Sequence, residues 1–542
     1  MSSLYDRSSL IQVPSLYKDG TLVSTIPEDR SGDFTVVRGS NLSATRVGED
    51  GYIKKGYENL LLQSNQFDTN WLSSGLTLTS GQAGYDGTND AWLFDKNNAG
   101  ASEFIRVDNS VSGVSTTSFY SKSNTLDWAF ILIFDGAVQR RAWFNVSTGE
   151  LGTLSNVIDA SIQSAGNGYY RCSVSVSGCT QLRIYAGVTD GAATGSLGSI
   201  YIQDAQLNQG LVAYPYLETT TNPVQGGLLE NTPRLDWSNG VPAVLVEEQR
   251  TNVVEHSEYF DATYWTKLNV SVSGLYESPS GKNDSYKITE NNASSAHITY
   301  SNSVITIVNG TSYTYSIFAK YDGRQWVRLW GEYGSTSLEA YFDIQNGVLG
   351  SKAVGVVSGI EDYGNGWYRI YATATTDGTG GRFRVYLADA DGSSAYQGDG
   401  ASGIYIYGAQ LEQGYPTSYI PTYGTTQTRS NEVISDNFDI PTTATIYNSF
   451  YSDTAETVFV LDQVFNVAEG LNKVAIAFSP TAVKISIGGS IVANATGTYD
   501  TTALSNIQLG SNNGTDYSNA PISGFYVFPE FLTDEELNSL TA

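Results

Sequence analysis

Hydrophobic and polar residues alternate along this chain in short runs, and clusters of Gly, Asn, Asp and Ser divide the runs. A spacing of about ten residues from one turn cluster to the next is typical of β-sandwich strands. One run places Trp326, Arg328 and Trp330 on one face of a strand. Val327 and Leu329 fall on the other face. The pattern predicts an all-β protein, and the 55 Gly, the 37 Tyr and the low charged fraction of 15% agree with it.

The last part of the chain follows the same pattern and adds a helix. Residues 483–487 and 491–492 flank Gly488-Gly489-Ser490, which predicts a hairpin. Thr533 and Glu536 have the spacing of a capping box, so we expect a short terminal helix to begin there. This region is interpreted as a third, smaller sandwich closed by that helix.

An internal repeat organises the middle of the chain. GSIYIQDAQLNQG at residues 198–210 returns as SGIYIYGAQLEQG at residues 402–414. Further matches precede each copy: Gly166-Asn167-Gly168 with Gly364-Asn365-Gly366, and Lys122 and Trp128 with Lys320 and Trp326 at equal spacing. Two homologous modules of roughly 170 residues are therefore expected, each the size of one domain.

The repeat divides the chain into five parts. They are an amino-terminal segment (1–57), module 1 (58–221), a linker with an edge strand (222–250), module 2 (251–424) and the carboxyl-terminal sandwich (425–542). The first part is too small for a confident domain of its own, so it is expected to pack on a neighbour or to dock to a partner.

The net charge of the chain disfavours some classes of binding partner. With 29 Lys and Arg against 55 Asp and Glu, the formal charge is -26, which disfavours nucleic acid and anionic membranes. A neutral polysaccharide remains compatible with this charge.

No apolar run has the length of a bilayer crossing, and the first residues lack the pattern of a secretion signal, so synthesis in a cytoplasm and no membrane insertion are expected. Cys172 and Cys179 cannot form a stapling framework, and they need not pair.

Three groups of motifs carry a resemblance to a known family. They are DFTVVRGS (33–40) with ATRV (44–47), RLDW (234–237) with EQRTN (248–252), and GAQLE (408–412) through YIPT (419–422). With these motifs the chain resembles a family of tailed-phage virion proteins. The modules resemble jelly-roll carbohydrate-binding modules, and the last part, with LTDEE at 532–536, resembles a laminin-G or concanavalin-A-like domain.

The resemblance implies a tail or head fibre, a spike or another appendage on the virion surface, made in the cytoplasm of the bacterial host. Its amino-terminal segment would dock to other virion proteins, its modules would attach to host-surface or environmental glycans, and a homotrimer is expected by analogy with fibres. A purely structural decoration, baseplate or collar protein is the alternative, because such modules occur throughout virions.

Trp326, Arg328, Trp330 and Tyr333 are the candidate glycan-binding residues. Two indoles beside a guanidinium offer a stacking platform and hydroxyl contacts, and burial of about 50 Å² of sugar face is worth about 1 kcal/mol per ring. The alternative is that both indoles cover the sheet edge or face a neighbouring subunit, with Arg328 stacked between them. Module 1 carries Trp128, Phe130 and Leu132 at the equivalent positions, a face better suited to burial.

Acidic loops suggest structural calcium. Asp389, Asp391 and Asp399 lie on a Gly-rich loop of module 2, and oxygen donors in such loops suit a hard cation. Solvated turn aspartates are the alternative. Module 1 has a comparable loop with Asp86, Asn89 and Asp90.

The catalytic inventory is small. His256 and His297 are the only histidines, which argues against a Ser-His-Asp arrangement and a multi-histidine metal site. Glycoside hydrolysis needs only two carboxylates, but Glu332, Glu339 and Glu361 stand in no distinguishing motif. A non-enzymatic protein is expected.

Overall fold

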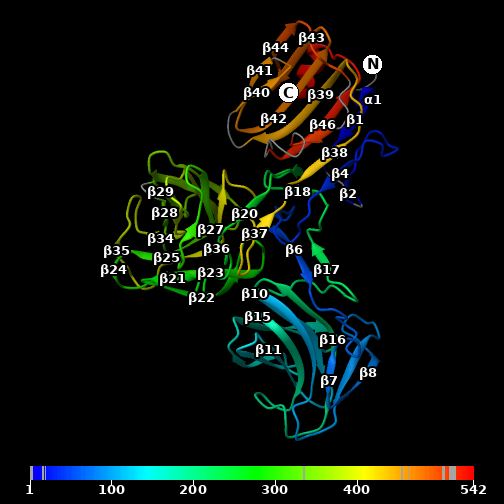
Figure 1. The fold of residues 1–542 in the computed structure, drawn as a ribbon, viewed down its shortest axis with the longest axis vertical. Coiled ribbons are helices and arrows are strands. Elements are labelled where there is room, and N and C mark those ends of the chain that lie inside the picture. Colours follow the sequence, from blue (N-terminus) through cyan, green and yellow to red (C-terminus); the bar gives the residue numbers. More distant parts are fainter. Residues whose placement is uncertain are drawn as a thin grey trace.

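The computed structural model describes residues 4–14, 17–18, 20–333, 336–452, 456–461, 463–502, 507–511 and 520–542. Within these ranges, 46 strands are accompanied by two short helices, α1 (Leu4–Arg7) and α2 (Asp534–Thr541), so the all-β prediction is confirmed. Figure 1 shows three lobes around a central junction, with module 1 at the bottom, module 2 at the left and a third sandwich at the top. No helix in the described part is long and apolar enough to cross a bilayer.

Module 1 is a sandwich of two sheets joined by two long strands. Its strands are β7 (Leu72–Ser74), β8 (Leu76–Gln82), β9 (Ala91–Lys96), β10 (Phe104–Ser123), β11 (Trp128–Phe134), β12 (Gln139–Asn145), β13 (Glu150–Ser155), β14 (Asp159–Gly166), β15 (Tyr169–Gly187) and β16 (Ser199–Gln209). One sheet has the order β14-β15-β10-β16-β9-β8 and the other β7-β10-β15-β11-β12-β13. Strands β10 and β15 serve both sheets, and each contains a glycine with positive φ near the crossing, Gly113 (75°) and Gly178 (81°).

Module 2 has two separate sheets. Its principal strands are β21 (Trp265–Leu268), β22 (Val270–Glu277), β23 (Asn283–Glu290), β25 (His297–Ser301), β27 (Ser312–Asp322), β28 (Trp326–Tyr333), β29 (Thr336–Asp343), β30 (Val348–Lys352), β31 (Val357–Asp362), β32 (Trp367–Thr375), β34 (Arg384–Ala388) and β36 (Gly403–Gln413). Short pairs join β24 (Ser294–Ser295) to β35 (Tyr396–Gln397) and β26 (Ile305–Thr306) to β33 (Gly380–Gly381).

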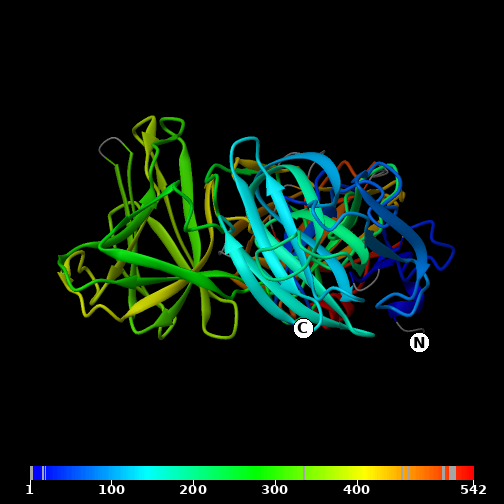
Figure 2. The same cartoon turned by 90° about the horizontal axis from the view of Figure 1, so that it is seen from below.

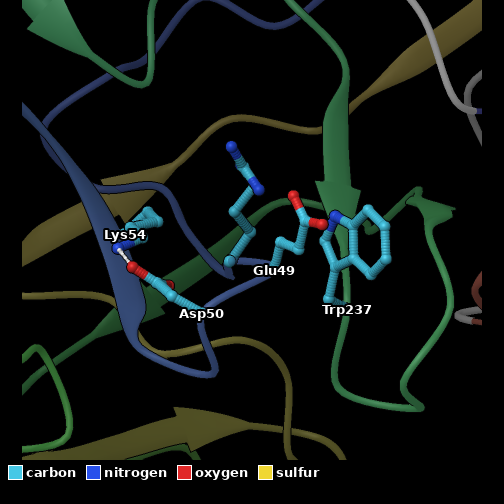
Figure 3. A pocket seen from close by; sticks show the side chains of 6 residues that line it. Glu49, Asp50, Lys54 and Trp237 are labelled. Carbon is cyan, nitrogen blue, oxygen red and sulfur yellow. Dashed lines mark hydrogen bonds and ion pairs between the residues drawn. The ribbon is translucent and has the colours of Figure 1, made fainter.

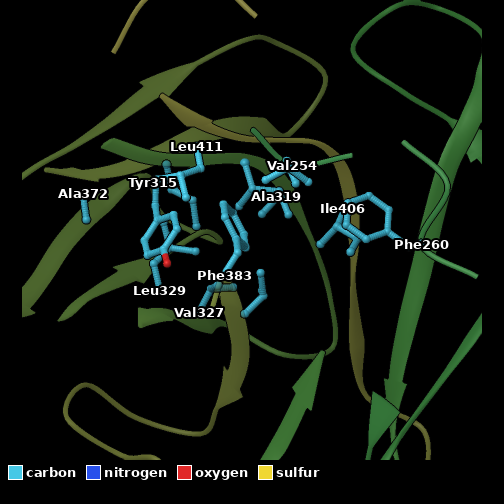
Figure 4. Close-up of a cluster of buried hydrophobic side chains, with 14 of the residues drawn as sticks. Val254, Phe260, Tyr315, Ala319, Val327, Leu329, Ala372, Phe383, Ile406 and Leu411 are labelled. Carbon is cyan, nitrogen blue, oxygen red and sulfur yellow. The ribbon is translucent and has the colours of Figure 1, made fainter. Parts of the chain in front are cut away.

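The two modules share one strand order. The sheets of module 2 run β31-β32-β27-β36-β23-β22 and β21-β25-β34-β28-β29-β30, which repeats the order of module 1 strand for strand. The predicted tandem duplication is therefore confirmed. Phe260, Tyr315 and Phe383 pack with aliphatic side chains between the two sheets of module 2 and form its core (Figure 4).

Local details are also duplicated. Asn167 and Asn365 have φ of 51° and 52° in turns that lead directly into β15 and β32, as the Gly-Asn-Gly motifs predict. A bulge interrupts β16 and β36 at one equivalent place, and the residues there, Asp204 and Gly408, have φ of 51° and 63°.

The third sandwich is built from three distant parts of the chain, and we call it the composite domain. Its larger sheet contains β1 (Leu10–Gln12), β18 (Arg234–Asp236), β19 (Ala243–Leu245), β39 (Ala444–Ser452), β42 (Gly470–Ser479), β43 (Ala482–Ile487), β44 (Ser490–Thr496) and β46 (Ile522–Phe528). Its second sheet contains β2 (Tyr17–Lys18), β3 (Thr21–Leu22), β4 (Phe34–Val37), β38 (Val433–Asp436) and β45 (Ile507–Leu509). Strands β40 (Glu456–Val460) and β41 (Gln463–Val467) form a separate hairpin.

This arrangement corrects the predicted division of the chain. Residues 1–57 pack on a neighbour, the first of the two expected alternatives, but they are part of the third sandwich and not a separate segment, because β1 pairs with β46 and β4 pairs with β38. Residues 222–250 are more than a linker, because β18 and β19 extend the same sheet. The hairpin at Gly488-Gly489 and the capping box of α2 lie where the sequence predicts them.

Short sheets connect the lobes. They are formed by β5 (Thr45–Val47), β6 (Ile53–Asn59) and β17 (Val224–Gly227), and by β20 (Arg250–Asn252) with β37 (Gln427–Arg429). Beside them lies a fully buried ionic cluster. Arg234 donates to Glu432 and Glu247, each at 2.7 Å, and Arg38 and Arg429 lie 3.0 Å from Glu432 and Glu247.

A second buried group ties β6 to module 2. Lys55 Nζ lies 2.5 Å from Glu258 Oε1 and 3.4 Å from Asp284 Oδ2. Tyr407 and Tyr419 each donate to Glu258 at 3.0 Å. Buried charges with this many partners require one geometry, so they fix the junction between the lobes.

Candidate functional site

The predicted strand face exists on β28. Val327 and Leu329 are fully buried in the core of module 2, while Trp326, Arg328 and Trp330 are half-buried on the opposite, outer face of the sheet. The alternation predicted for this strand is therefore confirmed. The side chain of Tyr333, the fourth candidate, lies outside the described residues.

Arg328 is enclosed by its neighbours. Its Nε lies 2.8 Å from Glu339 Oε1 on β29, and its side chain is only 11% exposed. Its guanidinium carbon lies 4.6 Å from the ring centroid of Tyr386 and 4.9 Å from that of Trp330. The charge is thus already compensated, which weakens the expectation that Arg328 donates to sugar hydroxyls.

Two further residues complete this face, and the sequence reasoning missed both. Arg384 on β34 lies directly opposite Trp330 in the sheet, with its guanidinium carbon 4.1 Å from the ring centroid. Tyr386 makes an edge contact with the same ring at 5.9 Å. Alternation within residues 384–388 would have placed Arg384 and Tyr386 on one face, but the sequence does not reveal that β34 pairs with β28.

Trp326 has a structural role that both modules retain. A Cβ at Gly350 would lie 2.6 Å from Trp326 Cζ3 and 2.6 Å from Asp391 Oδ1, so the indole and the carboxylate close over this glycine. In module 1, a Cβ at Gly152 would meet Trp128 Cζ3 at 2.5 Å and Asp190 Oδ1 at 2.6 Å. Trp330 has no such counterpart, because Leu132 of module 1 occupies its position.

The equivalent face of module 1 is sealed by its own side chains. Phe130 stacks on Trp143 at 3.9 Å and on Tyr185 at 4.1 Å, and all three are at most 5% exposed. Leu132 is 6% exposed. On this face module 1 keeps a contact of this kind, Arg183 at 4.6 Å from the ring centroid of Phe104, whereas the half-buried indole with two cations belongs to module 2.

The predicted calcium ligands are not brought together. The part of the chain that the structure describes contains no group of three or more His, Cys, Asp or Glu side chains able to hold a metal ion. Asp391 accepts from the backbone and the hydroxyl of Ser351 at 2.8 Å, and Asp389 accepts from Ser393. Asp399 accepts from the backbone N–H groups of residues 401 and 402 and from the Ser402 hydroxyl, which holds its pKa well below the usual range. Asp389 and Asp399 thus stabilise their own turns, and Asp391 joins its loop to β30.

The acidic loop of module 1 adjoins a buried carboxyl. Asp86 and Asp90 both accept from Thr88 and Gln203. Behind them, burial and these two charges raise the pKa of Asp204 to about 7, although a hydrogen bond from Tyr85 acts in the opposite direction and lowers it.

Cys172 and Cys179 are buried and unpaired, and burial raises the pKa of both thiols.

Comparisons with known proteins add little to this geometry. No protein-family model and no curated protein matches the chain. Among 33 matching chains of solved structures is the N-terminal CBM22-1–CBM22-2 tandem domain of Xyn10C from Paenibacillus barcinonensis, at 11% identity and a TM-score of 0.21 over 70% of this chain and 100% of that chain. Another is the CBM22-1–GH10 part of endo-1,4-beta-D-xylanase 10B from Clostridium thermocellum, complexed with xylohexaose, at 17% identity and a TM-score of 0.19 over 32% of this chain and 30% of that chain. Similarities at this level identify neither a family nor a ligand for this chain.

Proposed function

We propose that this chain is a non-enzymatic appendage protein of a tailed-phage virion that attaches to host-surface or environmental glycans through module 2. The observation that carries the glycan part is the outer face around Trp330. There a half-buried indole contacts two cations, Arg328 and Arg384, whereas the aromatic stack of Phe130, Trp143 and Tyr185 in module 1 is closed. The virion part rests on the resemblance of the sequence motifs.

The three-lobed arrangement suggests which lobe docks to the virion. The composite domain contains β1 and α2, the first strand and the last helix of the chain, and the two modules extend away from it (Figures 1 and 2). We therefore assign docking to other virion proteins to the composite domain as a whole. The modules would then face outward from the virion surface.

A single Trp330 site would be weak. Sugar stacking on one ring contributes about 1 kcal/mol, and the sugar has to compete with the cation–ring contacts already present. Useful attachment then requires several copies, which a homotrimer would supply.

Trp330→Ala should lower glycan binding while leaving module 2 folded. The indole is half-buried on the outer face, and its N–H donates only to Ser337 at 3.0 Å. Loss of about 1 kcal/mol corresponds to about a fivefold weaker site, and more for a multivalent particle. Glycan-array binding of the purified chain and adsorption of particles to host cells would measure the effect.

Trp326→Ala is the matched control, because its ring fills the space above Gly350. It should lower the melting temperature more than Trp330→Ala does and change binding less. Equal array signals for the wild type and Trp330→Ala would contradict the proposal. Release of reducing sugar from a bound polysaccharide would contradict its non-enzymatic part.

One observation favours a purely structural decoration, baseplate or collar protein. The ion pair of Arg328 with Glu339 leaves this face satisfied without a ligand. That function predicts blank glycan arrays and a Trp330 covered by another virion protein in the assembled particle.

A further inference from the structure

A hollow of about 410 Å³ lies at the junction of the lobes, and none of the residues of the module 2 face lines it (Figure 3). The turn between β5 and β6 forms one side, and the end of β18 forms the other. Its lining residues are Arg46, Gly48, Glu49, Asp50, Lys54 and Trp237. Its volume falls within the range of about 300–1,000 Å³ that is usual for small-molecule sites.

The backbone around the hollow is firmly held. Trp237 N–H donates to Val47 O at 3.1 Å, and Val47 N–H donates to Asp236 Oδ2 at 2.7 Å. A Cβ at Gly48 would lie 2.5 Å from Lys54 Cε and 2.8 Å from Asp50 Oδ1. The site is therefore preformed, and glycine at position 48 leaves room for the ion pair between Lys54 and Asp50.

The side chains present an aromatic surface between groups of both charges. Trp237 is half-buried, and Figure 3 shows the exposed Glu49 carboxyl beside its indole. Within the described part of the chain, no hydrogen bond or ion pair engages that carboxyl. Lys54 Nζ lies 2.5 Å from Asp50 Oδ2, and Arg46 Nη1 donates to Leu235 O at 2.7 Å.

We propose that this hollow is a second saccharide site, which binds one sugar ring of a neutral oligosaccharide against Trp237. An indole suits the apolar face of a pyranose, Glu49 accepts hydrogen bonds from its hydroxyls, and the cations Arg46 and Lys54 donate to them. A charged ligand fits less well, because carboxylates and cations both line the hollow.

The neighbouring surface extends the site. A second hollow of about 300 Å³ shares Arg46 and Lys54 with the first and contains Tyr17 and Tyr57. Tyr57 is stacked on Tyr214 at 4.6 Å. A glycan chain can thus continue past the two shared cations onto further aromatic rings.

The hollow also gives a role to two motif residues that lie outside the face of module 2. Arg46 comes from ATRV and Trp237 from RLDW. Other residues of these motifs, Thr45 and Arg234, belong to the buried ionic cluster, where Arg234 donates to Thr45 O at 2.9 Å. The same short stretches therefore supply both the junction and the hollow.

The ligand class rests on the proposed function, but the site does not, so one experiment separates them. The full chain is labelled with 5-fluorotryptophan, and its nine tryptophans are assigned in ¹⁹F spectra by single Trp→Phe variants. It is then titrated with gluco-, xylo-, manno- and galactohexaose. We expect at least one hexasaccharide to shift the Trp237 resonance in a saturable way.

Glu49→Gln should weaken that titration about tenfold, the usual loss for one charge-assisted hydrogen bond. Glu28→Gln, at another exposed glutamate, should leave it unchanged. If hexasaccharides shift the Trp330 resonance and leave that of Trp237 in place, this inference is overturned and the proposed function stands. If they shift Trp237 alone, the inference stands and the site at Trp330 is overturned. If neither resonance moves, both fail.

Discussion

Arg234→Ala should destabilise the protein by about 3–5 kcal/mol, the usual cost of removing one partner from a buried ion pair. The variant leaves the buried carboxylates of Glu432 and Glu247 without their central cation. Arg38 and Arg429 remain, but they contact one carboxylate each. Amide hydrogen exchange should show the largest loss of protection in β18, β19 and β38, because the cluster connects these strands.

A surface arginine of the same domain provides the comparison. Arg7 pairs with Glu530 and Glu536, but its side chain is 28% exposed. Pairs of that kind are worth about 0–1 kcal/mol, so Arg7→Ala should shift the melting temperature much less. Equal shifts for the two variants would show that the buried cluster does not hold the lobes together.

Asp204→Asn should stabilise module 1 above neutral pH. The pKa of Asp204 is raised from 3.8 to about 7, mainly by burial, so the folded module binds a proton that the unfolded chain has released. Stability should therefore fall as pH rises from about 4 to about 7 and stay lower above that. Since one pKa unit corresponds to about 1.4 kcal/mol, the loss approaches about 4 kcal/mol.

Asparagine removes this titration and suits the site, because it tolerates the positive φ of 51° and keeps an oxygen for the Tyr85 hydroxyl. Denaturant unfolding at pH 5 and pH 8 would measure the difference between variant and wild type. Asp135→Asn is the control, because the pKa shift of Asp135, and with it the effect of the substitution on stability, has the opposite sign. Backbone hydrogen bonds from Val138 and Ala137 lower the pKa of Asp135 to about 2, so this variant should lose stability above about pH 4. The same pH slope in Asp204→Asn and the wild type would contradict the prediction.

Features set by neighbouring residues could be predicted from the sequence. The alternation of Val327 and Leu329 with Trp326 and Trp330, the Gly-Asn-Gly turns and the capping box of α2 all depend on a few adjacent positions. The duplication predicted one strand order for both modules. The tandem β-sandwiches could therefore be predicted from the sequence.

The pairing between strands that are far apart in the chain could not be predicted from the sequence. Leu10 lies opposite Val527, and nothing local to either residue specifies the other. For the same reason Arg384 was missed at the candidate site. The calcium prediction treated Asp389, Asp391 and Asp399 as one group because they are close in sequence, whereas each folds back onto its own turn or a neighbouring strand.

The role of Trp326 could have been found by comparing the copies. The sequence shows Trp128 with Gly152 and Trp326 with Gly350, and a pair retained in both modules points to packing. A ligand-binding residue is better sought where the copies differ, as Trp330 and Leu132 do.

The composite domain has a consequence for how the chain matures. During translation β1 is made before both modules, and its partner β46 is made only after them. Until then the edge of β1 stays open. Closure of this lobe thus waits for β46, and a chain cut short after module 2 would display its sandwiches while lacking the completed domain by which we expect it to join a particle.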